Sequence, residues 1–394
     1  MKQRITAFTM SQVTGPGWML QKDITTRVII PINIKGNTLQ LRFSNRDGRK
    51  AACMEEVWIA KCNKTGKIES GMGIPVTASG NTELRFEAGT DLTSDEILLE
   101  VEPGDYLAVS IYCSARPRSV CPIGSHALQL IGQGNQCNKN FEPNTKPHWI
   151  VRQAGTVPTV CVPYFRALDI ISGSKPAVIS CLGDSITVHC KWYTPLLERL
   201  YQQYPGGLCL LNAGISGNRL LSDSPVSVGK TYGAAGIRRI EWDTFTDYGV
   251  THILFALGIN DLNLAELPLI DKAPIPMPEV YKRGCEELIA KAHKRGIKVL
   301  AYSLYPALTQ GAPKDLKREA FRQSYNEVIH SGIFDGVIDI EEALKDPARP
   351  AGYKEGYCVP DGLHLNETGG AVLAETAYFA LKNHVENDRI KLCD

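Results

Sequence analysis

The sequence has no excess of charge of either sign. Its 394 residues include 43 Lys and Arg against 42 Asp and Glu, which gives a formal net charge of +1 at pH 7. Proteins that bind nucleic-acid phosphates or anionic membrane surfaces need a basic excess or a basic patch, and the chain has no dense run of Lys and Arg. We therefore expect neither nucleic acid nor a membrane surface as a partner.

Long hydrophobic runs are also missing. No stretch reaches the roughly 18 apolar residues that a membrane-spanning helix requires, so no membrane span is expected. The first residues carry Lys2 and Arg4 but do not continue into the apolar segment of a signal peptide, because polar residues such as Gln12 interrupt them. These absences predict a cytoplasmic protein.

The cysteines are too widely spaced to form a familiar motif. The chain has 12 Cys, and none of them forms the C-x-x-C spacing of zinc ribbons and redox motifs. Disulfide-stapled domains have a far higher density of cysteine than this chain. We expect reduced and mostly buried thiols.

The first part of the chain, to about residue 170, has the pattern of an antiparallel β-structure. Short runs with strand-like composition are separated by Gly, Pro, Asn and Asp. In one of them Leu39, Leu41 and Phe43 alternate with polar residues, which is the period of a half-buried strand. The clearest runs are residues 27–34, 38–43 and 106–112. Many short strands with turn residues between them predict a β-sandwich, jelly-roll-like, over residues 1–172.

The pattern changes at about residue 175. Continuous apolar runs at 177–182, 208–211, 252–257 and 298–302 alternate with helical patterns at 194–204, 279–295, 315–330 and 368–385. Such alternation is typical of a parallel sheet that is covered on both faces by helices. The segment from Ser172 to Pro176 joins the two halves, so residues 173–394 are expected to form a second, α/β domain.

In a parallel α/β sheet, ligands bind beyond the carboxyl ends of the strands. Polar or Gly-rich residues that directly follow an apolar strand are therefore the site candidates. Three segments follow strands in this way, and a fourth lies in a loop before the last helix; they are residues 183–187, 212–218, 258–261 and 361–364.

These segments contain the residue types that nucleophilic catalysis needs. The hydroxyl of Ser185 attacks well only when a base removes its proton, and His364 is the natural base near pH 7. Asp361, three residues before His364, would hold the far ring nitrogen and fix the tautomer. The N–H groups of Ser185 and Gly214 and the side-chain amide of Asn260 are the candidate oxyanion-hole donors.

The four segments resemble the sequence blocks of the SGNH subgroup of GDSL esterases, in the family's order. The match places the nucleophile at Ser185, oxyanion groups at Gly214 and Asn260, and the acid and base at Asp361 and His364. The resemblance implies a flavodoxin-like three-layer α/β/α domain, ester hydrolysis through an acyl-serine, and no metal or organic cofactor. Residues 42–48 also resemble part of the β-rich module that precedes the hydrolase domain in some members.

Several other polar residues can be interpreted either as part of the site or as ordinary structural or surface residues. Asp339 follows another apolar run and competes with Asp361 as the partner of His364, although the spacing favours Asp361. His189, four residues after Ser185, is either a second base, a substrate contact or an ordinary pocket-edge residue, and it stays outside the catalytic set. The pair at 238–239, both Arg, is interpreted as a solvated face.

We expect a serine esterase that acts on small acyl groups, first of all acetyl groups on a sugar or oligosaccharide. A short-chain acyl esterase or lysophospholipase is the alternative within the class, and a non-catalytic carbohydrate-binding protein is the alternative outside it. Glycosidase chemistry needs a pair of carboxylates at strand ends, and no such pair stands out. The first domain is expected to shape the pocket, bind substrate or form a homo-oligomer, and a loop from Gln129 to Val162 is expected to reach towards the site.

Overall fold

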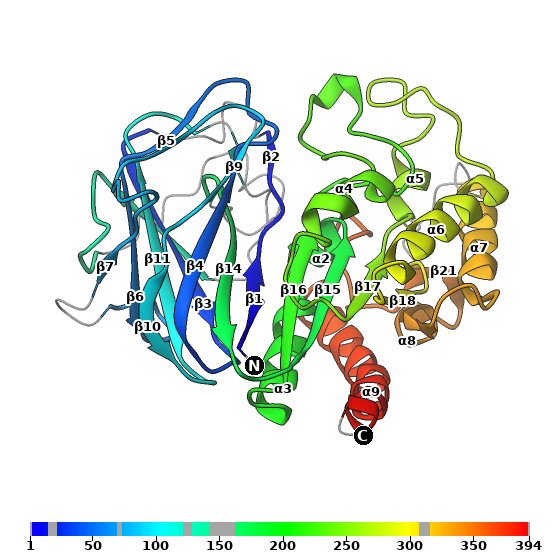
Figure 1. Ribbon diagram of the computed structural model, residues 1–394. Coiled ribbons are helices and arrows are strands. Elements are labelled where there is room, and N and C mark those ends of the chain that lie inside the picture. The colour runs from blue at the N-terminus through cyan, green and yellow to red at the C-terminus, as the bar shows by residue number, and fades with distance from the viewer. Residues whose placement is uncertain are drawn as a thin grey trace.

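The computed structural model describes residues 2–14, 22–68, 73–117, 119–120, 128–141, 162–306 and 316–392. Figure 1 shows the N-terminal strands on one side and the parallel sheet with its helices on the other. The fold is an antiparallel β-structure followed by an α/β domain, as the sequence predicts.

The N-terminal half contains two main antiparallel sheets. The first has the order β1 (Gln3–Thr9), β14 (Phe165–Ser172), β4 (Gly36–Ser44) and β10 (Ile97–Val101), with β9 (Asp91–Thr93) also paired to β4. The second has the order β13 (Leu128–Gln133), β3 (Ile24–Pro31), β11 (Tyr106–Cys113), β6 (Glu56–Cys62) and β7 (Ile74–Pro75). Two short pairs complete this half: β2 (Val13–Thr14) with β12 (Ser119–Val120), and β5 (Ala52–Met54) with β8 (Leu84–Phe86).

The alternation of side chains explains why the two sheets pack face to face. Along β4, Leu39, Leu41 and Phe43 are fully buried, while the residues between them are partly exposed. The inward residues of β4 share one hydrophobic core with those of the other sheet, such as Val28 and Ile111. The predicted β-sandwich is confirmed.

The C-terminal half is built on a parallel five-stranded sheet. Its order is β16 (Leu208–Gly214), β15 (Ala177–Gly183), β17 (His252–Ala256), β18 (Lys298–Tyr302) and β19 (Gly336–Ile338). In chain order this is 2-1-3-4-5, the flavodoxin-like arrangement. A short hairpin, β20 (Lys345–Asp346) with β21 (Arg349–Tyr353), lies outside the sheet.

Helices cover both faces of this sheet. One face packs against α2 (Ser185–Val188), α3 (Tyr193–Gln203), α8 (Ile340–Leu344) and α9 (Glu367–Leu392). The other packs against α4 (Gly236–Asp243), α5 (Ile259–Asn263), α6 (Pro278–His293) and α7 (Leu316–His330). A 3₁₀ turn, η2 (Val226–Val228), lies before α4. The four helices predicted from the sequence correspond to α3, α6, α7 and α9.

The two halves share a hydrophobic core. Met10, just after β1, forms a parallel bridge with Asn212 of β16, and Figure 1 shows β1 beside β16. Val178, Cys209 and Leu211 of the parallel sheet belong to the same buried cluster as the sandwich core. The proposed boundary at residue 173 lies between the end of β14 and the start of β15.

Three other expectations concern the stretch after Gln129, the state of the cysteines and membrane-spanning helices. The stretch from Gln129 onward begins as strand β13 rather than as a loop, and residues 142–161 lie outside the described part of the chain. Nine cysteines of the described ranges are free thiols, and six of these are buried. Within the described residues, no helix combines the length and the apolar composition that crossing a membrane requires.

The shared core predicts that one substitution in the parallel sheet destabilises both halves. Leu211 is fully buried in the common cluster, so we expect Leu211→Ala to lower the free energy of unfolding by about 2–5 kcal/mol. Urea denaturation followed by tryptophan fluorescence and by far-UV circular dichroism measures the loss. Leu98→Ala is the matched control, because Leu98 is 76% exposed and its truncation should change stability by no more than about 0.5 kcal/mol. Equal losses for the two variants would contradict the prediction.

Candidate active site

Ser185 lies at the first position of a helix that begins directly after a buried strand. β15 ends at Gly183, and Asp184 caps α2 by accepting the N–H of Ile186 at 2.9 Å. Ser185 itself is 7% exposed. No hydrogen bond among the described residues uses its N–H, as expected for the first turn of a helix. The strand end therefore presents both a hydroxyl and a free amide.

The loop before α9 brings a histidine and a carboxylate to this serine. Asp361 Oδ1 accepts the N–H groups of Leu363 and His364, both at 2.9 Å, across a turn in which Gly362 has φ +71°. The other carboxylate oxygen, Oδ2, lies 2.6 Å from His364 Nδ1, and His364 Nε2 lies 2.8 Å from Ser185 Oγ. The structure thus brings together the three side chains that the sequence predicts as a triad.

These contacts also set the charge of Asp361. Burial alone would raise the pKa of this carboxyl, but the His364 ring and the two backbone N–H groups that it accepts lower the pKa to about 2. Asp361 is therefore a carboxylate at any working pH. A carboxylate there favours the tautomer with the proton on His364 Nδ1, which leaves Nε2 free to accept the proton of Ser185.

Asn260 lies beside the serine, on the first turn of α5. Its Nδ2 donates to Asp184 Oδ2 and to the carbonyl of Asn218, both at 3.2 Å, the long end of the normal range. It therefore links the turn that carries Ser185 to the 215–218 loop. Burial raises the pKa of Asp184 to about 7.

Gly214 is not the free donor that the sequence predicts. Its N–H donates to the side-chain Oδ1 of Asn212 at 3.0 Å. The next glycine, Gly217, has φ +72° in the turn closed by the bond from Asn218 N to Ile215 O, and no hydrogen bond among the described residues uses its N–H. A left-handed glycine at the third position of a turn leaves that amide pointing away from the turn. The family resemblance assigned the oxyanion glycine to Gly214, whereas the hydrogen bonds and the turn geometry favour Gly217.

Asp339, the alternative to Asp361 as the partner of His364, has hydrogen-bond partners elsewhere. Asp339 caps α8 and accepts the hydroxyl of Ser303 at 3.0 Å. Asp261 holds the backbone N–H groups of the 220–221 segment at 2.7 and 3.0 Å. His189 lies against His364, with the two ring centroids 4.7 Å apart. Burial and the neighbouring His364 lower the pKa of His189 to about 3, so its ring is neutral.

The interpretation of residues 238–239 as a solvated pair is wrong for one of the two. Arg238 is exposed, but the Arg239 side chain is completely buried beneath the site. It donates to the carbonyls of Gly183 and Ala213, the residues that end or nearly end β15 and β16. The sequence carries one signal for this burial, an acidic residue at the i+4 position, Asp243.

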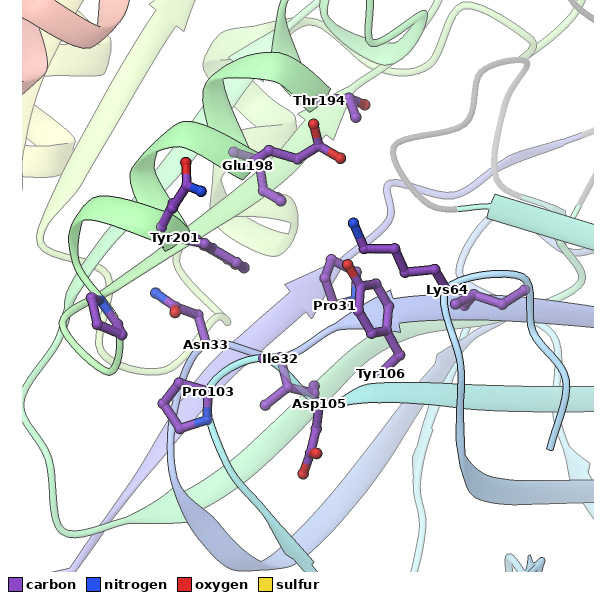
Figure 2. A pocket seen from close by; sticks show the side chains of 15 residues that line it. Pro31, Ile32, Asn33, Lys64, Pro103, Asp105, Tyr106, Thr194, Glu198 and Tyr201 are labelled. Atoms are coloured by element: carbon purple, nitrogen blue, oxygen red, sulfur yellow. The ribbon is translucent and has the colours of Figure 1, made fainter. Parts of the chain in front are cut away.

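A cleft lies away from the triad, between α3 and the N-terminal half. It has a volume of about 690 Å³. Figure 2 shows Glu198 and Tyr201 of α3 facing Lys64 and Tyr106 across it. None of the triad residues lines this cleft.

The comparisons with known proteins point to one family. Residues 181–372 match the GDSL-like Lipase/Acylhydrolase family. No curated protein matches the chain.

Three solved structures are similar to this chain over about half of its length. A psychrotrophic esterase, EstA, from Pseudoalteromonas sp. is 18% identical with a TM-score of 0.37, covering 53% of this chain and 98% of that one. A lipase/acylhydrolase from Enterococcus faecalis is 16% identical with a TM-score of 0.38, covering 53% and 96%. An acetyl xylan esterase, AlAXEase, is 20% identical with a TM-score of 0.39, covering 52% and 98%.

The buried carboxyl of Asp184 predicts a pH-dependent stability. Unfolded, it loses its proton near its ordinary pKa of 3.8, whereas folded it keeps the proton up to about 7. The unfolded state therefore binds fewer protons in this window, and the contribution of Asp184 to stability falls as the pH rises from about 4 to 7. We expect Asp184→Asn to remove this part of the slope. Urea denaturation of both proteins at pH 4.5 and 7.5 measures the difference between them, and parallel pH profiles would refute it.

Proposed function

Since residues 181–372 form a domain of the GDSL-like lipase/acylhydrolase family, we propose that the protein is a serine esterase that hydrolyses small acyl esters. The observation that carries the proposal is the continuous hydrogen-bonded path from Ser185 Oγ through His364 to Asp361. A serine at a strand end, a base in contact with it and a carboxylate that orients the base are the parts that acyl transfer requires.

In the proposed acylation step, Ser185 Oγ attacks the ester carbonyl carbon while its proton passes to His364 Nε2. The resulting imidazolium is stabilised by the Asp361 carboxylate, which the low pKa keeps ionised. The tetrahedral intermediate then collapses. The bond between the carbonyl carbon and the leaving oxygen breaks, and the departing alkoxide takes the proton from His364.

We assign the oxyanion hole to the N–H groups of Ser185 and Gly217 and to Asn260 Nδ2. The two amides are unused by other hydrogen bonds of the described residues. The two hydrogen bonds of Asn260 are both long, so its amide can turn towards a stronger, charged acceptor. Donors fixed in this way stabilise the negative charge that develops on the carbonyl oxygen.

The same groups complete the cycle. Water replaces the alcohol, gives a proton to His364 Nε2 and attacks the acyl carbon. The bond to Ser185 Oγ then breaks, the serine recovers its proton, and a carboxylic acid leaves. The chemistry of these side chains calls for no metal or organic cofactor.

For the substrate, we propose acetyl groups on a sugar or oligosaccharide. The supporting observation is His189, a neutral ring against His364 whose nitrogens take part in no hydrogen bond among the described residues. A neutral imidazole at this position can donate to or accept from a hydroxyl group next to the scissile ester. The alternatives are a short-chain acyl esterase or lysophospholipase, and a carbohydrate-binding protein without catalysis.

Covalent labelling tests the nucleophile. A fluorophosphonate probe should add to Ser185, detected by peptide mass spectrometry. Ser185→Ala should abolish the adduct and lower kcat on p-nitrophenyl acetate by about 10⁶, because the nucleophile is lost. Asp361→Asn should lower kcat by about 10⁴, since the wrong tautomer of His364 then dominates.

Ser331→Ala, a surface change of the same kind, serves as the control for this series. Unchanged hydrolysis in Ser185→Ala, with glycan binding intact, would exclude the esterase and favour the binding protein.

Chain length and leaving group test the substrate class. On p-nitrophenyl esters we expect the highest kcat/KM for acetate. On acetylated oligosaccharides, His189→Phe should lower kcat/KM about two- to tenfold through loss of one hydrogen bond, and it should leave p-nitrophenyl acetate unaffected. A maximum at acyl chains of eight carbons or longer would instead support the lipolytic alternative.

A further inference from the structure

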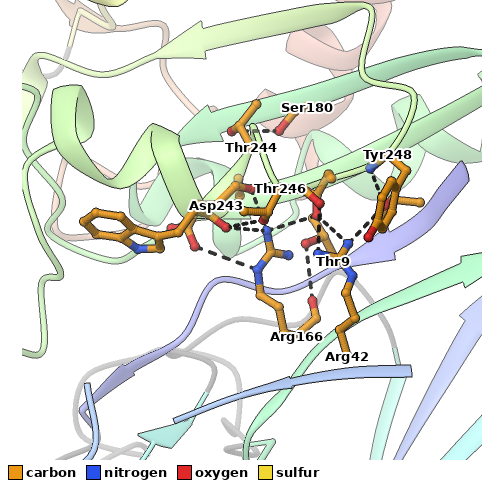
Figure 3. Close-up of polar contacts among 12 residues, drawn as sticks. Thr9, Arg42, Arg166, Ser180, Asp243, Thr244, Thr246 and Tyr248 are labelled. Atoms are coloured by element: carbon orange, nitrogen blue, oxygen red, sulfur yellow. Dashed lines mark hydrogen bonds and ion pairs between the residues drawn. The ribbon is translucent and has the colours of Figure 1, made fainter. Parts of the chain in front are cut away.

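Two arginines of the N-terminal sheet reach into the α/β domain. Arg42 of β4 and Arg166 of β14 both contact Asp247, which follows α4: their Nη2 atoms lie 2.8 and 3.1 Å from its Oδ1. Figure 3 shows the two side chains next to each other, pointing to the segment that carries Asp243 and Thr246. Arg42 also donates to Asp169 of β14: its Nε lies 2.8 Å from Oδ2 and its Nη2 lies 3.1 Å from Oδ1.

Arg166 also holds the last residue of α4. Its Nη2 donates to the backbone carbonyls of Trp242 and Asp243, at 3.2 and 2.8 Å, and its Nε lies 4.0 Å from Asp243 Oδ1. The other carboxylate oxygen of Asp243 accepts Arg239 Nη1 at 2.9 Å. A single carboxylate therefore lies between an arginine of the N-terminal half and the arginine beneath the site.

Arg239 in turn holds the backbone of both site segments. Its Nη2 donates to the carbonyl of Gly183, two residues before the nucleophile, and its Nη1 to the carbonyl of Ala213, both at 2.8 Å. Its Nε donates to Asn218 Oδ1 at 2.7 Å. Asn218 follows Gly217 and accepts Asn260 Nδ2 through its carbonyl, so one guanidinium fixes the nucleophile turn and the loop that carries the oxyanion donors.

The whole set is buried and balanced in charge. It consists of three arginines and three aspartates, and each side chain is at most 12% exposed: Arg42, Arg166, Arg239, Asp169, Asp243 and Asp247. Buried charges cannot be exchanged for water, so removing one member displaces its neighbours instead of merely solvating them. Exposed ion pairs between the halves, such as Lys230 with Asp47 at 3.2 Å, lack this constraint.

We propose that Arg166 and Arg42 are positioning residues for the active site, acting through Asp243 and Arg239 on the nucleophile turn and the oxyanion loop. The N-terminal half would thereby set the turnover rate without touching the substrate. The inference rests on the proposed esterase function. A displacement of about 1 Å in a catalytic group is enough to lower the rate about 100-fold.

The test removes the contacts of Arg166 with the α/β domain and keeps the net charge of the buried set unchanged. The double variant Arg166→Met/Asp247→Asn loses one positive and one negative charge, and the amide oxygen of the substituted side chain remains an acceptor for Arg42. The number of competent sites is measured from the stoichiometry of fluorophosphonate labelling, and kcat is expressed per labelled site. We expect kcat on p-nitrophenyl acetate to fall about 10- to 100-fold with KM unchanged within about twofold. Lys230→Ala, which breaks an exposed pair between the same halves, should match the wild-type enzyme.

Hydrogen exchange supplies a readout that does not depend on catalysis. Peptides covering residues 183–189 and 211–221 should exchange faster in the double variant than in the wild-type protein or in Lys230→Ala, because their anchor is weakened. A wild-type kcat per labelled site, or unchanged exchange in both peptides, overturns the positioning role even if the melting temperature falls.

Two further variants test the proposal if the double variant fails to fold. Arg166→Lys keeps the charge and should show a smaller loss of kcat, and Asp243→Asn, which keeps an acceptor for Arg239, should show a loss at unchanged KM. Wild-type kcat in both would also overturn the proposal. Absence of labelling and hydrolysis in the wild-type protein would refute the esterase function instead, and the exchange measurement would still decide the positioning role.

Discussion

One buried guanidinium, that of Arg239, binds the backbone of two segments of the candidate active site. The carbonyls of Gly183 and Ala213 lie at or next to the ends of adjacent parallel strands, and both residues are buried. Arg239 satisfies both and reaches Asn218 with its remaining nitrogen. The planar guanidinium of an arginine has five N–H donors in a fixed arrangement, so it can bind several acceptors in different directions at once. The compact ammonium group of a lysine cannot reproduce this geometry. The geometry of the site therefore depends on a residue that contacts neither Ser185 nor His364 in the hydrogen bonds described.

Much of the fold follows from local sequence patterns. The period-2 alternation around Leu41 and the apolar run before Ser185 predict the two sheet types, because each pattern matches the number of faces that a strand buries. The strand-end rule then selects Ser185 and Asn260, since the carboxyl ends of parallel strands meet at one edge. The loop with Asp361 and His364 is short enough for its own turn to bring the two side chains into contact.

What the sequence does not predict depends on contacts between distant residues. The burial of Arg239 requires the carbonyls of two strands and the carboxylate of Asp243, and only Asp243, four residues later in the same helix, distinguishes it from Arg238 in the sequence. The occupied amide of Gly214 depends on the rotamer of Asn212, whose side chain also donates to the carbonyl of Thr187 in α2. The pairing of Arg42 and Arg166 with Asp247 lies between the halves, beyond the range of any local pattern.

The pairing of β1 has a consequence for biosynthesis. Thr6 bonds to Asp169, 163 residues later, and accepts the N–H of Tyr248, 242 residues later, while Met10 pairs with Asn212. Strand β1 therefore has no strand partner until β14, about 160 residues later, has left the ribosome. Closing such long loops is slow, and an unpaired strand edge exposed in the meantime promotes aggregation. The contacts that join the two halves of the folded protein thus connect β1 to segments that are synthesised much later.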